Sequence, residues 1–92
     1  MPYTEDHLRQ EVEQNGLQDL SNYFVTLPIE SAAGVLNQVG YSLVLRWIKL
    51  KGRKYFSFAV FIGTLICCVF EIYRRLIAPY EEEKIKDNGD IT

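Results

Sequence analysis

One stretch limits what this chain can fold into more than any other. Residues 55 to 70 read YFSFAVFIGTLICCVF, sixteen positions without a charge. Such a stretch either crosses a membrane or is buried among other helices. A spanning helix needs about 20 mostly apolar residues, and this one is shorter and ends at Glu71. Cations flank it on both sides, at Arg53–Lys54 and at Arg74–Arg75, so they give no clear orientation to an inserted helix.

The periodicity of this region also favours a buried helix. Apolar residues continue past Glu71 at a spacing of three and four, which is typical of an amphipathic helix. They are Phe58, Phe61, Ile62, Leu65, Val69, Ile72 and Leu76. A second, polar line of Thr64, Cys67, Glu71 and Arg74 shares one helix face. Because polar and charged side chains are costly in the apolar core of a bilayer, we expect a soluble protein. Membrane insertion is the alternative.

The 92 residues allow one small domain, and their pattern predicts an all-α fold. Two long antiparallel helices are expected at about 30–51 and 56–78, forming a hairpin over 30–78. The region 1–29 is expected to hold a short helix from Thr4 to Gln14 and then a connector over 16–29. Pro79 is expected to end or kink the second long helix. The region 79–92 is expected to form a short acidic helix and tail. A domain this small buries a smaller share of its unfolded surface than a larger domain does, so we expect oligomerisation to complete the fold.

Charge is distributed unevenly along the chain. Residues 1–30 carry a net charge of −5, residues 31–78 carry +6, and residues 79–92 carry −3. The acidic ends are therefore expected to cover the basic middle, within one chain or between copies. The most basic part is the predicted turn, with Arg46, Lys49, Lys51, Arg53 and Lys54. It is short and the chain is acidic overall, so nucleic acid is not the expected partner.

Catalytic and metal-binding signatures are missing from the sequence. His7 is the only histidine, no Cys-x-x-Cys accompanies it, and no glycine-rich phosphate loop is present. Cys67 and Cys68 are adjacent on a predicted helix and point about 100° apart, so we expect no disulfide between them. We expect neither enzyme activity nor a cofactor or metal.

The strongest candidate for a binding site surrounds Glu71. Arg74 and Arg75 lie three and four residues after it, where a helix brings both within reach of its carboxylate. In one interpretation the three form only an intrahelical ion pair. In the other, Glu71 holds a guanidinium that binds a phosphate or carboxylate. The candidate ligand-binding residues are Glu71, Tyr73, Arg74, Arg75, Tyr80 and Lys84.

Several motifs in residues 34–90 resemble a family of small proteins from tailed bacteriophages and prophages. They are Gly34-Val35-Leu36-Asn37, Glu71-Ile72-Tyr73-Arg74-Arg75, Ala78-Pro79-Tyr80-Glu81, Lys84-Ile85 and Asn88-Gly89-Asp90. The chain departs from the family pattern at Ile66, where an acidic residue is usual, and at Glu82 and Glu83, where Asp and Lys are usual. The resemblance implies a soluble protein in the cytoplasm of an infected bacterium, and it implies no particular activity.

The sequence supports three functional hypotheses from different classes. The first is a non-enzymatic phage protein that forms a homo-oligomer and binds an anionic, nucleotide-like small molecule. Such binding could sequester a signalling nucleotide of a bacterial immune system. The second is an interaction protein that docks on a host or phage protein. The third is a small single-span protein of the inner membrane, similar in size to a holin.

Overall fold

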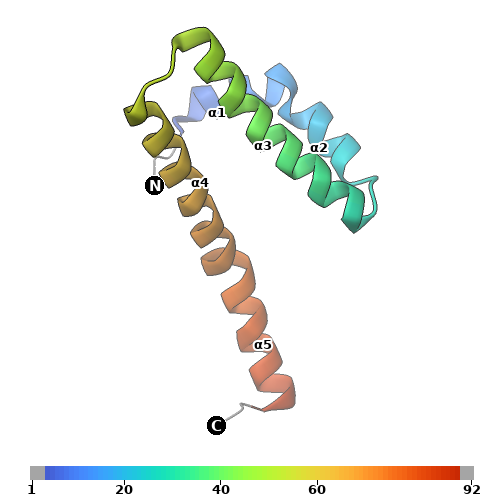
Figure 1. Ribbon diagram of the computed structural model, residues 1–92. Helices are drawn as coiled ribbons and strands as arrows, with labels where there is room; N and C mark the ends of the chain where they lie inside the picture. Colours follow the sequence, from blue (N-terminus) through green and yellow to red (C-terminus); the bar gives the residue numbers. More distant parts are fainter. Residues whose placement is uncertain (1–3, 90–92) are drawn as a thin grey trace. The chain divides into compact units, whose positions relative to one another are not determined.

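The structure, a computed structural model, describes residues 4–89 and is all-helical over that range (Figure 1). These residues form two units, residues 4–54 and residues 55–89. The first unit contains α1 (Asp6–Val12), the π-helical segment η1 (Glu13–Leu17), α2 (Gln18–Phe24) and α3 (Ile29–Lys51). The second contains α4 (Tyr55–Ile72), the π-helical segment η2 (Tyr73–Ile77) and α5 (Ala78–Asn88). The all-α prediction is confirmed.

In the first unit, the predicted stop at Asn15-Gly16 is a bend between two helices. Gly16 has φ 129°, a value that L-residues with a side chain rarely adopt. The Asn15 side chain donates a hydrogen bond to the carbonyl oxygen of Glu11 at 2.7 Å. The chain then resumes as α2, so the prediction of a connector over 16–29 was wrong. Leu17, Leu20 and Phe24 are spaced as a helix face, and the connection itself is only residues 25–28.

The helix α3 matches its prediction to within one residue. It begins after Pro28, whose extended backbone has ψ 159° and whose carbonyl oxygen accepts from the Ala32 amide at 2.9 Å. It ends at Gly52, whose φ of 98° and ψ of 154° suit glycine alone. Within the unit, α2 runs back along α3 (Figure 1). Leu20, Phe24, Val35 and Val39 line an apolar hollow of about 320 Å³ between the two helices.

The second unit is one continuous helix from Tyr55 to Asn88. Of the two predicted effects of Pro79, ending or kinking the long helix, the first was therefore wrong, and α5 is not a separate helix. Proline cannot donate an amide hydrogen bond and its ring crowds the preceding turn. The wider π-helical turn of η2, just before Pro79, is a common way for a helix to accommodate such a residue. The helix ends where predicted, at Asn88-Gly89, and Asp90 lies outside the described residues.

Very little of the chain is buried. Among residues 4–89, only Ala32 and Ile48 are buried, and α4 contains no buried residue. The accessible surface is 8330 Å². A compact monomer of this mass exposes about 5,500 Å², and two separate compact halves would expose about 6,600 Å². Residues 55–70, which the sequence predicts to be buried, thus contain no buried residue in the described structure.

Candidate functional site

The residues around Glu71 form a compact ion-pair cluster, which we call the Glu71 clamp (Glu71, Arg74 and Arg75). Arg74 Nη2 lies 2.9 Å from Glu71 Oε1 and 3.0 Å from Oε2. Arg75 Nε lies 2.8 Å from Glu71 Oε2. One carboxylate thus holds two guanidinium groups, as the i+3 and i+4 spacing predicts. The clamp carries a net charge of about +1.

The three residues of the clamp differ in exposure: Glu71 is mostly covered, whereas Arg74 and Arg75 are accessible to solvent. The Glu71 side chain is 22% exposed, whereas each arginine side chain is 63% exposed. Exposed ion pairs of this kind contribute only about 0.3–0.5 kcal/mol each to stability. The arrangement therefore does more to orient the guanidinium groups than to stabilise the helix. Oriented and accessible guanidinium groups suit a phosphate or carboxylate, because their planar fork of donors matches those anions.

The other three predicted site residues do not join the clamp. Tyr73 lies two residues after Glu71, and residues at that spacing do not face one another on a helix. Its hydroxyl is 3.4 Å from Glu81 Oε2, a long and exposed hydrogen bond. Lys84 Nζ lies 5.5 Å from the centre of the Tyr80 ring. The chain thus brings together Glu71, Arg74 and Arg75 as one group and Tyr80 with Lys84 as another.

Sequence reasoning did not include Glu81, which the structure places at the Tyr73 hydroxyl. The signal was present but weak, because an i, i+8 pair lies about two helical turns apart and is rarely considered. A carboxylate at this position makes the tyrosine side of the helix more acidic. On this helix, the side with Tyr73 is therefore less suitable for an anion than the clamp.

The basic end of α3 forms a separate surface. Lys51 Nζ lies 5.8 Å from the centre of the Trp47 ring, one helical turn away. These two residues line a shallow hollow of about 260 Å³ together with Leu43, Arg46 and Leu50. The hollow is mostly apolar with a cationic rim, so it resembles a helix-packing surface more than a nucleic-acid site.

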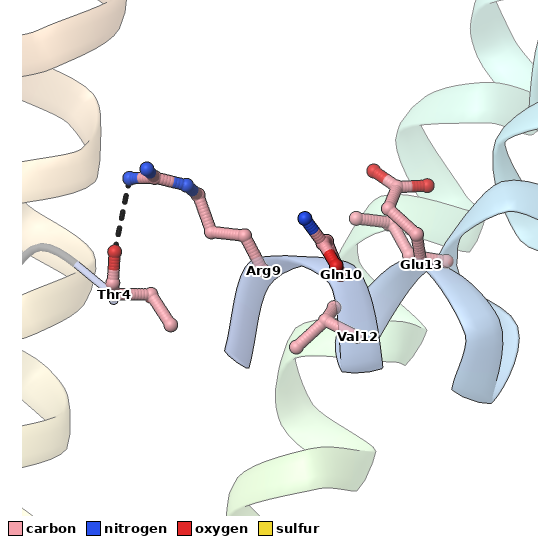
Figure 2. A pocket seen from close by; sticks show the side chains of 6 residues that line it. Thr4, Arg9, Gln10, Val12 and Glu13 are labelled. Atoms are coloured by element: carbon pink, nitrogen blue, oxygen red, sulfur yellow. Dashed lines mark hydrogen bonds between the residues drawn. The ribbon is translucent and has the colours of Figure 1, made fainter. Parts of the chain in front are cut away.

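A further hollow lies near the N-terminus, where Arg9 extends toward Thr4 (Figure 2). Arg9 Nη1 donates to the Thr4 carbonyl oxygen at 2.9 Å, and Arg9 also forms an ion pair with Asp6. His7 is exposed, and its Nδ1 atom lies 3.5 Å from Glu5 Oε2. Arg9 already serves the local structure of α1, and this hollow offers no group of catalytic residues.

The cysteines and acidic residues give no metal centre in the part of the chain described. Cys67 and Cys68 are free thiols, as their adjacent positions predict. Over residues 4–89, no group of three or more His, Cys, Asp or Glu side chains is placed to hold a metal ion. The helix from Tyr55 to Asn88 does satisfy the length and composition of a membrane span, with a mean hydropathy of 2.1 over its most apolar 18 residues.

Comparison with known proteins identifies a family but no activity. A family model described as a domain of unknown function (DUF6899) matches residues 1–91, so the chain belongs to that family. No curated protein matches the chain. No solved structure matches it either. The geometry of the clamp and of the exposed helices is therefore the basis for a functional proposal.

Proposed function

We propose that this member of the family is a non-enzymatic helical protein that binds a phosphate-bearing, nucleotide-like small molecule through Arg74 and Arg75. The observation that carries the proposal is the Glu71 clamp, in which one carboxylate holds two guanidinium groups that are each 63% exposed. The role that fits best is sequestration of a signalling nucleotide in the cytoplasm of an infected bacterium, because sequestration needs affinity and abundance but no catalytic group.

The charges of the clamp suit this role. An incoming phosphate meets two cations and one carboxylate, so the electrostatic balance is attractive. Glu71 limits the rotamers of both arginines before the anion arrives, which lowers the entropy lost on binding. Hydrogen bonds from a guanidinium to an ionised oxygen are roughly twice as strong as neutral ones. Tyr73, Tyr80 and Lys84 extend the proposed ligand contacts only where another copy brings them near a clamp.

We also propose that α3 and α4 pack against each other as the antiparallel hairpin that the sequence predicts. Each helix carries an exposed apolar stripe that fits the seven-residue repeat of a coiled coil, with alternating three-and-four spacing on α4 and spacings of seven, seven, four and three on α3. We call the stripe on α4 and η2 the hairpin seam: Phe58, Ile62, Leu65, Val69, Ile72 and Leu76. The stripe on α3 is Ile29, Leu36, Leu43, Trp47 and Leu50, all at least 48% exposed.

The two stripes are complementary in register. With the turn centred on Gly52 and Arg53, Trp47 would oppose Phe58, and Leu43 would oppose Ile62. Gly40 would then oppose Leu65. No heavy atom lies within 4 Å of a Cβ built at Gly40, so this position has room for a large side chain. Pairing of this kind would cover much of the exposed apolar surface of both helices.

Anion binding is tested by thermal shift and calorimetry, with inorganic phosphate, ATP and a cyclic dinucleotide as probes. The test variant is Arg74→Ala/Arg75→Ala, and the matched control is Arg46→Ala/Lys49→Ala, which removes two cations from α3. We expect at least one probe to stabilise the wild type and the control, and the test variant to lose the effect. No shift with any probe, or an equal loss in the control, would overturn the proposal.

A second candidate function is a single membrane span. The observation in its favour is that the most apolar 18-residue window of the Tyr55–Asn88 helix has no buried residue. Fractionation decides between the two functions. Recovery in the membrane fraction after an alkaline wash would establish the span, whereas a detergent-free soluble protein would exclude it.

A further inference from the structure

The long helix carries a second apolar seam beside the hairpin seam. We call it the outer seam, and its members again alternate at spacings of three and four. They are Phe56, Ala59, Gly63, Ile66, Phe70, Tyr73, Ile77 and Tyr80. Its large side chains are between 41% and 77% exposed. Each member follows a hairpin-seam position by about one residue, so the two seams lie about 100° apart around the helix.

A single neighbouring helix cannot cover two seams that diverge by this angle. Once the hairpin seam packs on α3, the outer seam still faces outward. We propose that the outer seam is an interface with a second copy of this chain, and that the two long helices pair there in antiparallel orientation. This interface rests on the hairpin of the proposed function, since the hairpin assigns the other seam to α3.

The exposed area is sufficient for such an interface. The chain exposes 8330 Å², about 1,700 Å² more than two separate compact halves would expose. A stable interface of ordinary size removes about 800 Å² from each partner. A hairpin contact of that size would remove about 1,600 Å² from this chain, because both of its helices belong to it. The chain exposes about 2,800 Å² more than one compact monomer of its mass, which allows for the hairpin contact and for a contact with a second copy.

Side-chain size indicates the antiparallel direction. The outer seam contains two small residues, Ala59 and Gly63, near one end and large residues near the other. In an antiparallel pair centred near residue 68, Gly63 would oppose the second copy's Tyr73, and Ala59 would oppose its Ile77. No heavy atom lies within 4 Å of a Cβ built at Gly63, so a large ring has room there. A parallel pair would instead place small residues opposite small residues and leave cavities.

Charge indicates the same direction. The same register places Glu82 and Glu83 of one copy beside Lys54 and Arg53 of the other, and the contact occurs twice because the pair is symmetric. A parallel pair would place the acidic segments of the two α5 helices side by side. Like charges in register disfavour that arrangement and specify the orientation.

The length of the outer seam argues for a protein partner over lipid. The uncharged run ends at residue 70, but the seam continues through Tyr73, Ile77 and Tyr80. In that part of the helix, Glu71 and the two arginines occupy the polar face. A lipid-facing surface would stop at the charges, whereas a helix-packing seam can continue past them.

Disulfide trapping tests the interface directly. Cys67→Ser/Cys68→Ser provides a cysteine-free background, into which Ala59→Cys and Ile77→Cys are introduced singly. In the antiparallel pair these two positions face each other, while two copies of the same position lie about 27 Å apart. We therefore expect oxidation to cross-link an equal mixture of the two variants and to leave each variant alone monomeric on a non-reducing gel.

Other outcomes overturn the proposal. Cross-linking of each variant with itself would establish parallel pairing. No cross-link in any sample would exclude the outer seam as the interface. Circular dichroism checks that each variant keeps its helix content. A charge exchange gives a second test, in which Glu82→Lys/Glu83→Lys and Arg53→Glu/Lys54→Glu each weaken self-association in sedimentation. Mixing the two is expected to restore it, and no restoration contradicts the pairing.

These measurements separate the interface from anion binding. The thermal shift with phosphate probes is recorded on the cysteine-free background, which keeps the Glu71 clamp intact. A shift without cross-linking would leave the proposed function standing and remove the outer-seam interface. Cross-linking without a shift would do the reverse.

Discussion

Replacing Leu65 by Ala measures whether the hairpin seam is covered in the folded protein. The Leu65 side chain is 51% exposed in the single chain. The substitution removes three carbon atoms, each worth about 0.8 kcal/mol when fully buried. If Leu65 stayed as exposed as this, the free energy of unfolding would fall by only about 1.2 kcal/mol. If a second helix covers it, the loss should reach about 2–5 kcal/mol, as for core leucines.

Urea unfolding monitored by circular dichroism gives this difference. The matched control is Leu8→Ala in α1, because Leu8 is 42% exposed and lies outside both seams. We expect the control to lose no more than about 1.4 kcal/mol and Leu65→Ala to lose about 2–5 kcal/mol. Equal losses in the two variants would refute the reasoning that α4 is covered through its hairpin seam. The comparison is made at one protein concentration, since self-association also contributes to apparent stability.

Three further substitutions have distinct expected effects. Gly52→Ala should lower the free energy of unfolding by about 1–3 kcal/mol, because φ 98° and ψ 154° strain any other residue, and urea unfolding measures it. Gly34→Ala, within helix α3, with open space around it and outside the stripe proposed to face α4, should raise it by up to about 1 kcal/mol, and a loss there would contradict the open environment. Glu71→Gln should lower it by about 0.5–1 kcal/mol at low salt, since two helical ion pairs are lost, and the difference should shrink in 1 M salt.

Secondary structure followed from the sequence where local signals were strong. Pro28 and Gly52 fix the ends of α3 through backbone preferences that hold in any context. The interpretation failed at α2, where the sequence predicted a connector over 16–29 and the structure has a helix from Gln18 to Phe24. The separate helix expected after Pro79 was also wrong, because the wider turn of η2, which lets the helix continue, has no sequence signature.

The sequence also predicted one part of the candidate site, the contacts of Glu71, but not how the other site residues group in space. Spacing alone was enough to predict that Glu71 reaches both arginines, because i+3 and i+4 neighbours meet on any helix. The grouping of Tyr73, Tyr80 and Lys84 with the clamp was based on proximity along the chain. Within the helix, rotation about the axis separates residues that are close in sequence, and the structure places Tyr73 near Glu81 instead.

The sequence by itself determined the helical content, the limits of α3, the hairpin seam and the ion pairs of the clamp. All of these depend on interactions within a few residues, which a linear pattern records. Only the tertiary structure decided that α2 packs along α3 and that the helix continues through Pro79. Those outcomes depend on which surfaces meet, and burial is a property of the whole set of neighbours around a side chain.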